Sequence, residues 1–333
     1  MKFSAAEYGS ELMAPRIGYH ASHEQFTPAD LLGLVKMAES AGFECLKCSD
    51  HFQPWSERQG QSASAWPWLG AAMQATTLPF GIISAPGYRY HPAVLAQSIA
   101  TVASLFEERL WVALGSGEAI NEAITGEAWP EKAERNARLL ECIEVIRRLL
   151  DGETVTHRGR ITVVEARLYS RPKNRVPLYG AAVTEKTARL LAPQVDGLLT
   201  TGGDPRATGK VIRAFREGGG AGKPVILQAA LCWARSHDEA MAEALDQWGP
   251  CAIGGEVNWD LRRPADFDLA SKTVGPDDIA SAVFVSHELD AHAERIAALA
   301  ELGPAEIHLH HVGRDQRGFI ETFGAKVLPQ LRQ

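Results

Sequence analysis

Two short segments of the chain combine residue types that can move protons. Residues 49–55 read SDHFQPW, in which His51 follows Asp50 directly. Because an imidazole titrates near neutral pH, His51 is a candidate general base. Residues 115–122 read GSGEAINE, where glycines let a planar or anionic ligand approach the backbone and Glu118 could protonate or hydrogen-bond a cofactor nitrogen. The alternative interpretation is a turn histidine and a solvated glutamate, since GxG without a third glycine is no dinucleotide fingerprint.

Two further groups of polar residues also follow candidate strands. Arg89, Tyr90 and His91 are interpreted as surface or helix-capping residues. On a strand, His308 and His310 share one face, which suggests a metal pair as in barrel hydrolases. The complementary ligands, an early HxH and a barrel lysine, are absent, so no metal site is predicted.

Strand-like and helix-like segments alternate from end to end and must position these residues. Thr27-Pro28 opens one helix, which stops at Gly42. Residues 155–169 alternate like an inserted β-hairpin, and residues 249–275 are predicted to be a long irregular loop. Strands are predicted at 15–21, 43–49, 78–86, 110–117, 176–182, 195–202, 223–234 and 305–312. Eight β/α pairs at this length predict one α/β domain over residues 1–333, a (β/α)8 TIM barrel with loop insertions and its active site at the C-terminal ends of the strands.

Composition excludes several classes of function. The 333 residues carry a formal net charge of −7 and no long Lys/Arg cluster, which argues against nucleic-acid and anionic-membrane partners. No apolar run approaches the roughly 20 residues of a membrane span, and residues 1–16 lack the apolar core of a signal peptide, so a cytoplasmic protein is expected. The five cysteines, including the Cys45–Cys48 CxxC, are predicted to be structural thiols.

Several segments, in the same order along nearly the whole chain, resemble one known group of enzymes. The segments are GYHASHEQF (18–26), SDHFQPW (49–55), YRYHPAVLAQ (88–97), GSGEAINEAITG (115–126), AWPEKAER (128–135) and DQRGFIETF (315–323). They are similar to the glucose-6-phosphate dehydrogenase branch of the luciferase-like flavin and deazaflavin oxidoreductases. The resemblance implies a barrel that is usually dimeric, with an isoalloxazine-type ring lying across the strand ends.

The resemblance also implies roles for individual residues. His51 is the proton-abstracting base, Glu118 the acid near the ring, and Trp55 shapes the substrate pocket. A non-prolyl cis peptide is expected near Ile82–Ile83–Ser84. The residues expected to bind the cofactor are Asp50, Ile82, Ile83, Ser84, Gly115, Ser116, Gly117, Asn121, Val183 and Thr184.

Departures from the pattern bear on cofactor and substrate. Where deazaflavin-using members carry Gly-Gly after the fifth strand, this chain has Val183 and Thr184, whose side chains narrow the phosphate site. FMN is therefore the expected cofactor and the deazaflavin coenzyme F420 the alternative, with the Thr184 hydroxyl still available to a phosphate. The branch's three basic phosphate-binding residues correspond to Asp204, Asn258 and Ala282, and a neighbouring histidine to Trp259. Without those charges, glucose-6-phosphate is not the expected substrate.

The function expected from these residues is hydride transfer through a flavin-type cofactor on a small organic substrate. A monooxygenase is included in that expectation, because FMN can react with oxygen. The first alternative is an F420-dependent dehydrogenase or reductase. From other classes, the alternatives are a metal-dependent barrel hydrolase using Asp50, His51 and the C-terminal histidines, and a non-catalytic flavin-binding protein. A small-molecule substrate and a homodimer are the expected partners.

Overall fold

Parallel strands form the centre of the molecule. The computed structural model describes residues 14–255 and 257–332. The prediction that residues 1–16 are not a signal peptide therefore lies mostly outside the described residues. The strands of the main sheet are β1 (Arg16–Ala21), β2 (Cys45–Ser49), β3 (Phe80–Ser84), β4 (Leu110–Leu114), β7 (Leu178–Ala181), β8 (Gly197–Thr201), β9 (Val225–Cys232) and β11 (Glu306–His311). Their order around the sheet follows their order in the chain, with β10 (Phe284–Val285) added beside β9.

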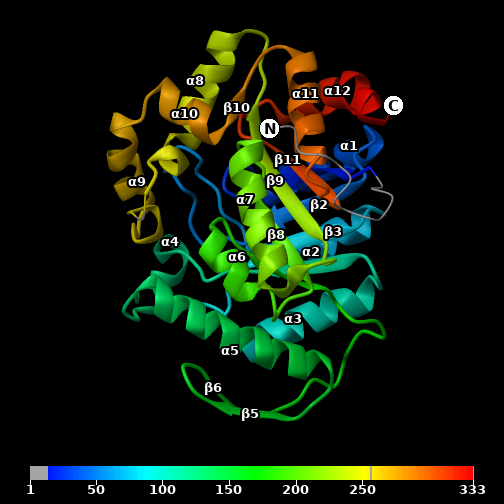
Figure 1. Cartoon of the computed structure of the whole chain (residues 1–333), viewed down its shortest axis with the longest axis vertical. Helices are drawn as coiled ribbons and strands as arrows, with labels where there is room; N and C mark the ends of the chain where they lie inside the picture. Colours follow the sequence, from blue (N-terminus) through cyan, green and yellow to red (C-terminus); the bar gives the residue numbers. More distant parts are fainter. Residues whose placement is uncertain (1–13, 256, 333) are drawn as a thin grey trace.

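The sheet closes on itself. Strand β9 pairs in parallel with both β8 and β11, and β1 pairs in parallel with both β11 and β2. Helices cover the outside of this closed sheet (Figure 1). The predicted (β/α)8 barrel is therefore confirmed.

The connecting segments are mostly helical. The helices are α1 (Pro28–Ser40), α2 (Ala65–Ala75), α3 (Pro92–Leu105), α4 (Ala119–Glu122), α5 (Lys132–Leu150), α6 (Glu185–Leu191), α7 (Pro205–Phe215), α8 (His237–Trp248), α9 (Pro264–Ala270), α10 (Pro276–Ala282), α11 (Leu289–Ala300) and α12 (Gln316–Lys326). Short turns of 3-10 helix lie at 123–125, 249–252, 257–259, 271–273 and 328–332, and one π turn lies at 216–220. Thr27 caps α1 as predicted, because its side chain accepts a hydrogen bond from the Asp30 N–H.

Two segments differ from the sequence prediction. Helix α2 was not predicted, because AWPWLGAAMQA has no charged residue and hence no clear polar face. The segment 249–275 is not one irregular loop, since α9 and three turns of 3-10 helix interrupt it. The hairpin prediction is confirmed: β5 (Val155–Arg158) and β6 (Thr162–Ala166) pair antiparallel and lie beyond α5 (Figure 1).

The interior of the barrel is divided between an apolar and a polar side. Alternate residues of β4, β7, β8 and β9 form an apolar cluster, Trp111, Ala113, Tyr179, Leu199 and Ile226. On β1, β2 and β11 the buried residues at interior positions are polar: His20, Lys47, His308 and His310. Burial lowers the pKa of Lys47 to about 8 and that of His310 to about 3, so this side holds its histidines neutral.

The predicted cis peptide near Ile82–Ser84 is wrong. No peptide bond among the described residues is cis. Strand β3 keeps regular parallel pairing with β4 as far as Ser84, and the Ser84 carbonyl accepts a hydrogen bond from the Gly115 N–H at 3.0 Å. Regular pairing is compatible with the trans form, which is favoured for a non-prolyl bond by about 3 kcal/mol.

Gly81 is expected to be a packing requirement of the barrel interior. A Cβ at this position would lie 2.0 Å from the Trp111 ring. Gly81→Ala should therefore lower the free energy of unfolding by about 1–3 kcal/mol, measured by urea denaturation. Gly33→Ala is the matched control, because nothing lies within 4 Å of the added methyl group and α1 should gain about 0.5–1 kcal/mol. Equal stability of the Gly81 variant and the native protein would contradict the packing argument.

Candidate active site

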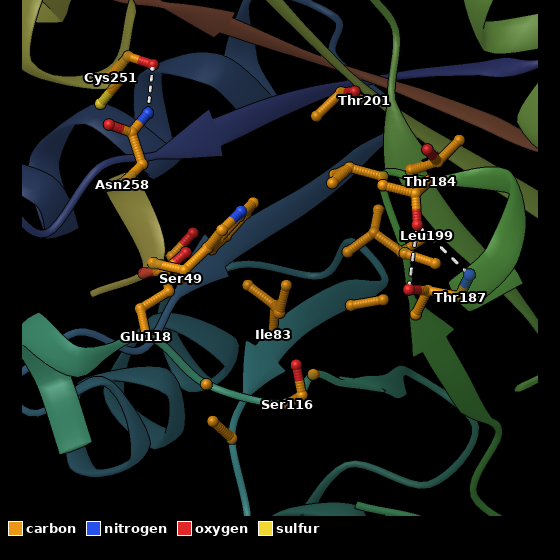
Figure 2. A pocket seen from close by; sticks show the side chains of 18 of the residues that line it. Ser49, Ile83, Ser116, Glu118, Thr184, Thr187, Leu199, Thr201, Cys251 and Asn258 are labelled. Atoms are coloured by element: carbon orange, nitrogen blue, oxygen red, sulfur yellow. Dashed lines mark hydrogen bonds between the residues drawn. The ribbon is translucent and has the colours of Figure 1, made fainter. Parts of the chain in front are cut away.

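A large cavity opens at the C-terminal ends of the barrel strands. Its volume is about 1770 Å³, and loops following β1, β2, β3, β4, β7 and β8 contribute to its walls together with segment 249–262. Figure 2 shows side chains from the ends of β2, β3 and β8, from the loops after β4 and β7, and from Cys251 and Asn258 around one space. The C-terminal ends of parallel strands meet at one edge of a barrel, which explains why residues far apart in sequence converge here.

All but one of the predicted site residues line this cavity. They are Asp50, His51, Trp55, Ile83, Ser84, Gly115, Ser116, Gly117, Glu118, Asn121, Val183 and Thr184. Ile82 is the exception, because its side chain does not line the cavity, and its predicted contact with the cofactor stays a prediction. Neighbouring residues on a strand face opposite sides, so Ile82 is fully buried in the core between barrel and helices while Ile83 faces the cavity.

His51 lies in a cluster of polar groups. Its Nδ1 is 3.3 Å from the Asn121 amide nitrogen and 3.6 Å from Glu24 Oε1, and its ring centroid is 5.3 Å from that of Trp55. Glu24 is buried; desolvation alone would raise its pKa, but its pKa is lowered because His51, the Ser22 hydroxyl and a backbone hydrogen bond outweigh the desolvation. Sequence reasoning missed Glu24, although it lies directly after β1 within the segment GYHASHEQF.

Glu118 is the second proton-carrying group of the cluster. Burial raises its pKa above the usual value, and the nearby His51 and Lys132 oppose the rise. The Asn121 amide donates to Glu118 Oε2 at 3.3 Å, so Asn121 contacts both His51 and Glu118. The cluster therefore places a histidine near a carboxyl group whose pKa is raised by burial.

Asp50 connects the loops that follow β2 and β3. Its Oδ2 accepts a hydrogen bond from Ser84 Oγ at 2.7 Å, and its Oδ1 lies 3.3 Å from both Arg89 Nη1 and Tyr90 Oη. The interpretation of Arg89 as a surface residue is wrong, because only 10% of its side chain is exposed. His91 caps α3 as expected, since its ring accepts a hydrogen bond from the Ala93 N–H.

An apolar platform forms the middle of the cavity. Ile83, Ala181 and Leu199 come from β3, β7 and β8, and two of them are labelled in Figure 2. Beside them Gly115 leaves open space, because a Cβ there would meet only the Ala181 methyl group, at 3.6 Å. Such a flat apolar surface with glycine at its edge suits a planar ring system.

Val183 and Thr184 line the cavity at its α6 side. The Thr184 side chain caps α6: its Oγ1 accepts a hydrogen bond from the Thr187 N–H at 3.3 Å and donates to Thr187 Oγ1 at 3.0 Å. Lys186 also lines this part of the cavity. Val183 and Thr184 therefore face the cavity after the fifth barrel strand, β7, and Lys186 adds a positive charge to this part of its wall.

The opposite part of the cavity carries aromatic residues. Trp248, Cys251 and Trp259 line it with Trp55, and Asn258 donates to the Cys251 carbonyl. Asp204, Asn258 and Ala282 are all cavity residues, so the positions predicted to lack positive charge do face the cavity. Lys132, Arg135 and Arg262 also line it; Lys132 donates to Ser116 Oγ, and Arg135 lies 3.4 Å from Asp260.

The C-terminal histidines are not a metal pair at this cavity. His310 lines the cavity, whereas His308 is fully buried with its Nε2 2.7 Å from Glu306 Oε2. Within the described ranges, the only cluster with metal-ligand spacing is Cys45, Glu306 and His308. Glu306 is already paired with Arg16 and accepts a hydrogen bond from Trp111, and neither Asp50 nor His51 joins this cluster. Cys45 and Cys48 are both buried and free, in agreement with a structural role.

Comparisons with known proteins agree with this fold and site. Residues 11–306 match the family described as Luciferase-like monooxygenase, and the chain belongs to that family. It is 36% identical over 329 residues to an F420-dependent glucose-6-phosphate dehydrogenase of Microbacterium testaceum, covering 96% of this chain and 98% of that protein.

Two solved structures are also similar. An F420-dependent secondary alcohol dehydrogenase, in complex with an F420–acetone adduct, superposes with a TM-score of 0.88 at 32% identity, covering 96% of this chain and all of that chain. A riboflavin lyase with modified FMN superposes with a TM-score of 0.72 at 14% identity, covering 96% and 92% of the two chains, and shows the fold alone. The protein is therefore a luciferase-like oxidoreductase whose similar relatives use F420. No helix in the described part of the chain is long and apolar enough to cross a membrane.

Proposed function

We propose that this protein is an F420-dependent dehydrogenase that oxidises a small alcohol. The observation that carries the proposal is the Asn121 bridge between His51 and Glu118 beside the apolar platform. One group accepts a proton and the other supplies one, which is what removal of a hydride and a proton from an alcohol requires. The relatives with 32–36% identity over nearly the whole chain use F420, and this similarity supports the coenzyme assignment.

The cavity residues fit a deazaflavin. Ile83, Ala181 and Leu199 would hold its ring system, and Val183, Thr184 and Lys186 would meet its phosphate-bearing tail. The sequence favoured FMN because of Val183 and Thr184. FMN has less support from the comparisons, since the riboflavin lyase that contains a modified FMN is 14% identical to this chain. When bound, the coenzyme accepts a hydride from the substrate carbon.

The chain's own residues handle the protons. With its ring hydrogen on Nδ1, directed at Glu24 Oε1, His51 would have the lone pair of Nε2 free to take the proton of the substrate hydroxyl. The Glu24 carboxylate stabilises the resulting imidazolium. The carboxyl group of Glu118, whose pKa burial raises, would donate a proton to a ring nitrogen of the bound coenzyme, and Trp55 packs against the histidine ring.

The expected substrate lacks a phosphate group. Asp204, Asn258 and Ala282 give a dianion no charge-assisted partners where relatives are expected to have them. Trp55, Trp248 and Trp259 instead provide an aromatic wall. A small alcohol with an apolar substituent matches these groups better than a sugar phosphate, in keeping with the relative described as a secondary alcohol dehydrogenase.

Separate titrations with F420 and FMN test the coenzyme assignment. Fluorescence quenching should give a dissociation constant at least about tenfold lower for F420, and the loaded enzyme should bleach F420 with propan-2-ol but not with glucose-6-phosphate. Tighter binding of FMN would overturn the coenzyme assignment. Binding of F420 without turnover of any alcohol would support the non-catalytic alternative.

We also propose a homodimer with α2 and α3 in its interface. Neither helix contains a charged residue, and their outward positions include Ala71, Val94, Thr101 and Leu105. An uncharged outer face over two neighbouring helices suits a second copy of the same uncharged surface. Light scattering should show twice the chain mass, and Val94→Lys should produce monomers; a native monomer would contradict the proposal.

A further inference from the structure

An arginine in the loop after β3 connects the two neighbouring loops that carry His51 and Glu118. Asp50 directly follows β2, Arg89 follows β3, and Glu122 closes the short helix α4 after β4. The side chains of Asp50 and Glu122 are 0% and 1% exposed, and that of Arg89 is 10% exposed. One guanidinium is thus enclosed between two buried carboxyl groups.

The contacts of Arg89 reach the backbone of the proposed base. Its Nη2 donates to the Asp50 carbonyl oxygen at 2.8 Å, and this carbonyl belongs to the peptide bond that precedes His51. Its Nη1 lies 3.3 Å from Asp50 Oδ1. The same side chain therefore holds both the carboxylate and the backbone of Asp50, and the planar guanidinium presents its donors in a fixed fork, whereas an ammonium carries three donors on a flexible stem.

Glu122 fixes Arg89 from the other side. Its Oε2 accepts a hydrogen bond from the Arg89 backbone N–H at 2.9 Å, and its Oε1 lies 3.6 Å from Arg89 Nε. Burial raises the pKa of Glu122 to about 7, and the nearby Arg89 opposes that rise. Without the guanidinium, the two buried carboxyl groups would have no positive charge between them, which is unfavourable in a site of low polarity.

The rest of the His51 loop is held by contacts within the loop and from its neighbours. The His51 carbonyl accepts a hydrogen bond from Ser62 Oγ of the same loop at 2.9 Å, and Asn121 Oδ1 accepts one from the Phe52 N–H at 2.8 Å. The Asp50 N–H donates to the Ile83 carbonyl at 3.1 Å, which extends the pairing of β2 with β3 by one residue. Beyond that bond, Arg89 holds the peptide before His51 and Asn121 holds the chain after it, so these contacts help to set where the imidazole lies.

We propose that Arg89 is a positioning residue for the proposed active site, which orients His51 by clamping the Asp50–His51 peptide against Glu122. Arg89 is not among the residues that line the cavity, whereas Asp50, His51 and Glu122 are. It therefore acts through its partners rather than on substrate or coenzyme. This inference rests on the proposed function only for the role of His51 as base; the clamp itself is a property of the protein alone.

The test compares Arg89→Met and Arg89→Lys with the matched control Arg109→Met. Arg109 also donates to backbone carbonyls, those of Thr76 and Leu78, but at the N-terminal end of β3, away from the cavity. The first readout is the histidine imidazole ¹H–¹⁵N spectrum of the protein without coenzyme at one fixed pH, with the His51 signals assigned by their loss in His51→Asn. The second readout is kcat and KM with F420 and propan-2-ol.

The His51 imidazole signals should move in Arg89→Met, move less in Arg89→Lys, and stay in place in Arg109→Met. The value of kcat should fall about 10–100-fold in Arg89→Met with KM within about threefold, because a misplacement of about 1 Å can cost that much. Partial recovery in Arg89→Lys would follow from the retained charge. Arg109→Met should reduce thermal stability and leave kcat unchanged.

His51 signals that superpose on those of the native protein in Arg89→Met would overturn the proposal. If Arg89→Met does not fold, unmoved His51 signals in Arg89→Lys would overturn it equally. Because this readout needs neither coenzyme nor substrate, its failure is distinguishable from failure of the F420 proposal. Conversely, if the His51 signals move in Arg89→Met but the native protein does not bind F420, the positioning role of Arg89 would stand and the proposed F420-dependent function would be rejected.

Discussion

His51→Ala is expected to lower kcat about 10²–10⁴-fold while the dissociation constant of the coenzyme stays within about threefold. The substitution removes the imidazole that lies 3.6 Å from Glu24 and 3.3 Å from Asn121, and with it the acceptor for the substrate proton. It leaves the apolar platform of Ile83, Ala181 and Leu199 untouched, so the ring system should still bind. Steady-state kinetics with F420 and propan-2-ol, beside an F420 titration, measure both quantities.

His237→Ala is the matched control for that experiment. His237 is the exposed first residue of α8, and its replacement should change neither quantity. A His51→Ala enzyme with native kcat would mean that another group accepts the proton. An enzyme in which coenzyme binding and kcat are lost together would instead point to a structural role for His51.

Glu118→Gln is expected to lower kcat about 10²-fold or more, because glutamine keeps the shape of the side chain but supplies no proton. The pH dependence follows from the direction of the pKa shift. Burial raises the pKa of Glu118, so the carboxyl group stays protonated to a higher pH than an ordinary glutamic acid. The native kcat should fall as pH rises through that raised pKa, and the residual rate of Glu118→Gln should lack this fall.

The raised pKa of Glu118 also predicts that Glu118→Gln, which lowers kcat, increases the stability of the folded protein at neutral pH. A carboxyl group whose pKa is higher in the folded than in the unfolded protein costs stability once the unfolded chain ionises, and the cost grows as pH rises to the folded pKa. Glu118→Gln should therefore unfold at higher urea than the native protein at pH 7, and at the same urea below pH 4. A variant that is less stable at pH 7 would show that Glu118 is held ionised, and would remove it as the proton donor.

Much of the active site follows from strand periodicity. Apolar segments alternating with helices predict the barrel, and a barrel brings the C-terminal ends of its strands to one edge. His51 and Glu118 could thus be assigned to one cavity from the chain alone. Asn121 and Ile82 were assigned through the family resemblance, and Ile82 shows its limit: the segment was assigned correctly, but the Ile82 side chain faces the opposite side of β3 from Ile83.

Other features depend on packing between distant segments. Glu24 and Arg89 resemble surface residues in sequence, and only the folded loops place them beside His51 and Asp50. Helix α2 could not be recognised from its sequence, because it contains no charged residue and therefore has no clear polar face. Its tryptophans are buried in the folded protein. The segment 249–275 forms short helical turns that its glycine and proline content did not predict.

By itself, the sequence determined the barrel and the cavity end of each strand, and together with the family resemblance it indicated twelve of the residues that line the cavity. These depend on local alternation and on the order of strands, which are written directly in the chain. The tertiary structure alone decided which charges pair: Glu24 with His51, and Asp50 and Glu122 with Arg89. Such pairs join loops from different strands, and their energies depend on distances and burial that no local pattern encodes.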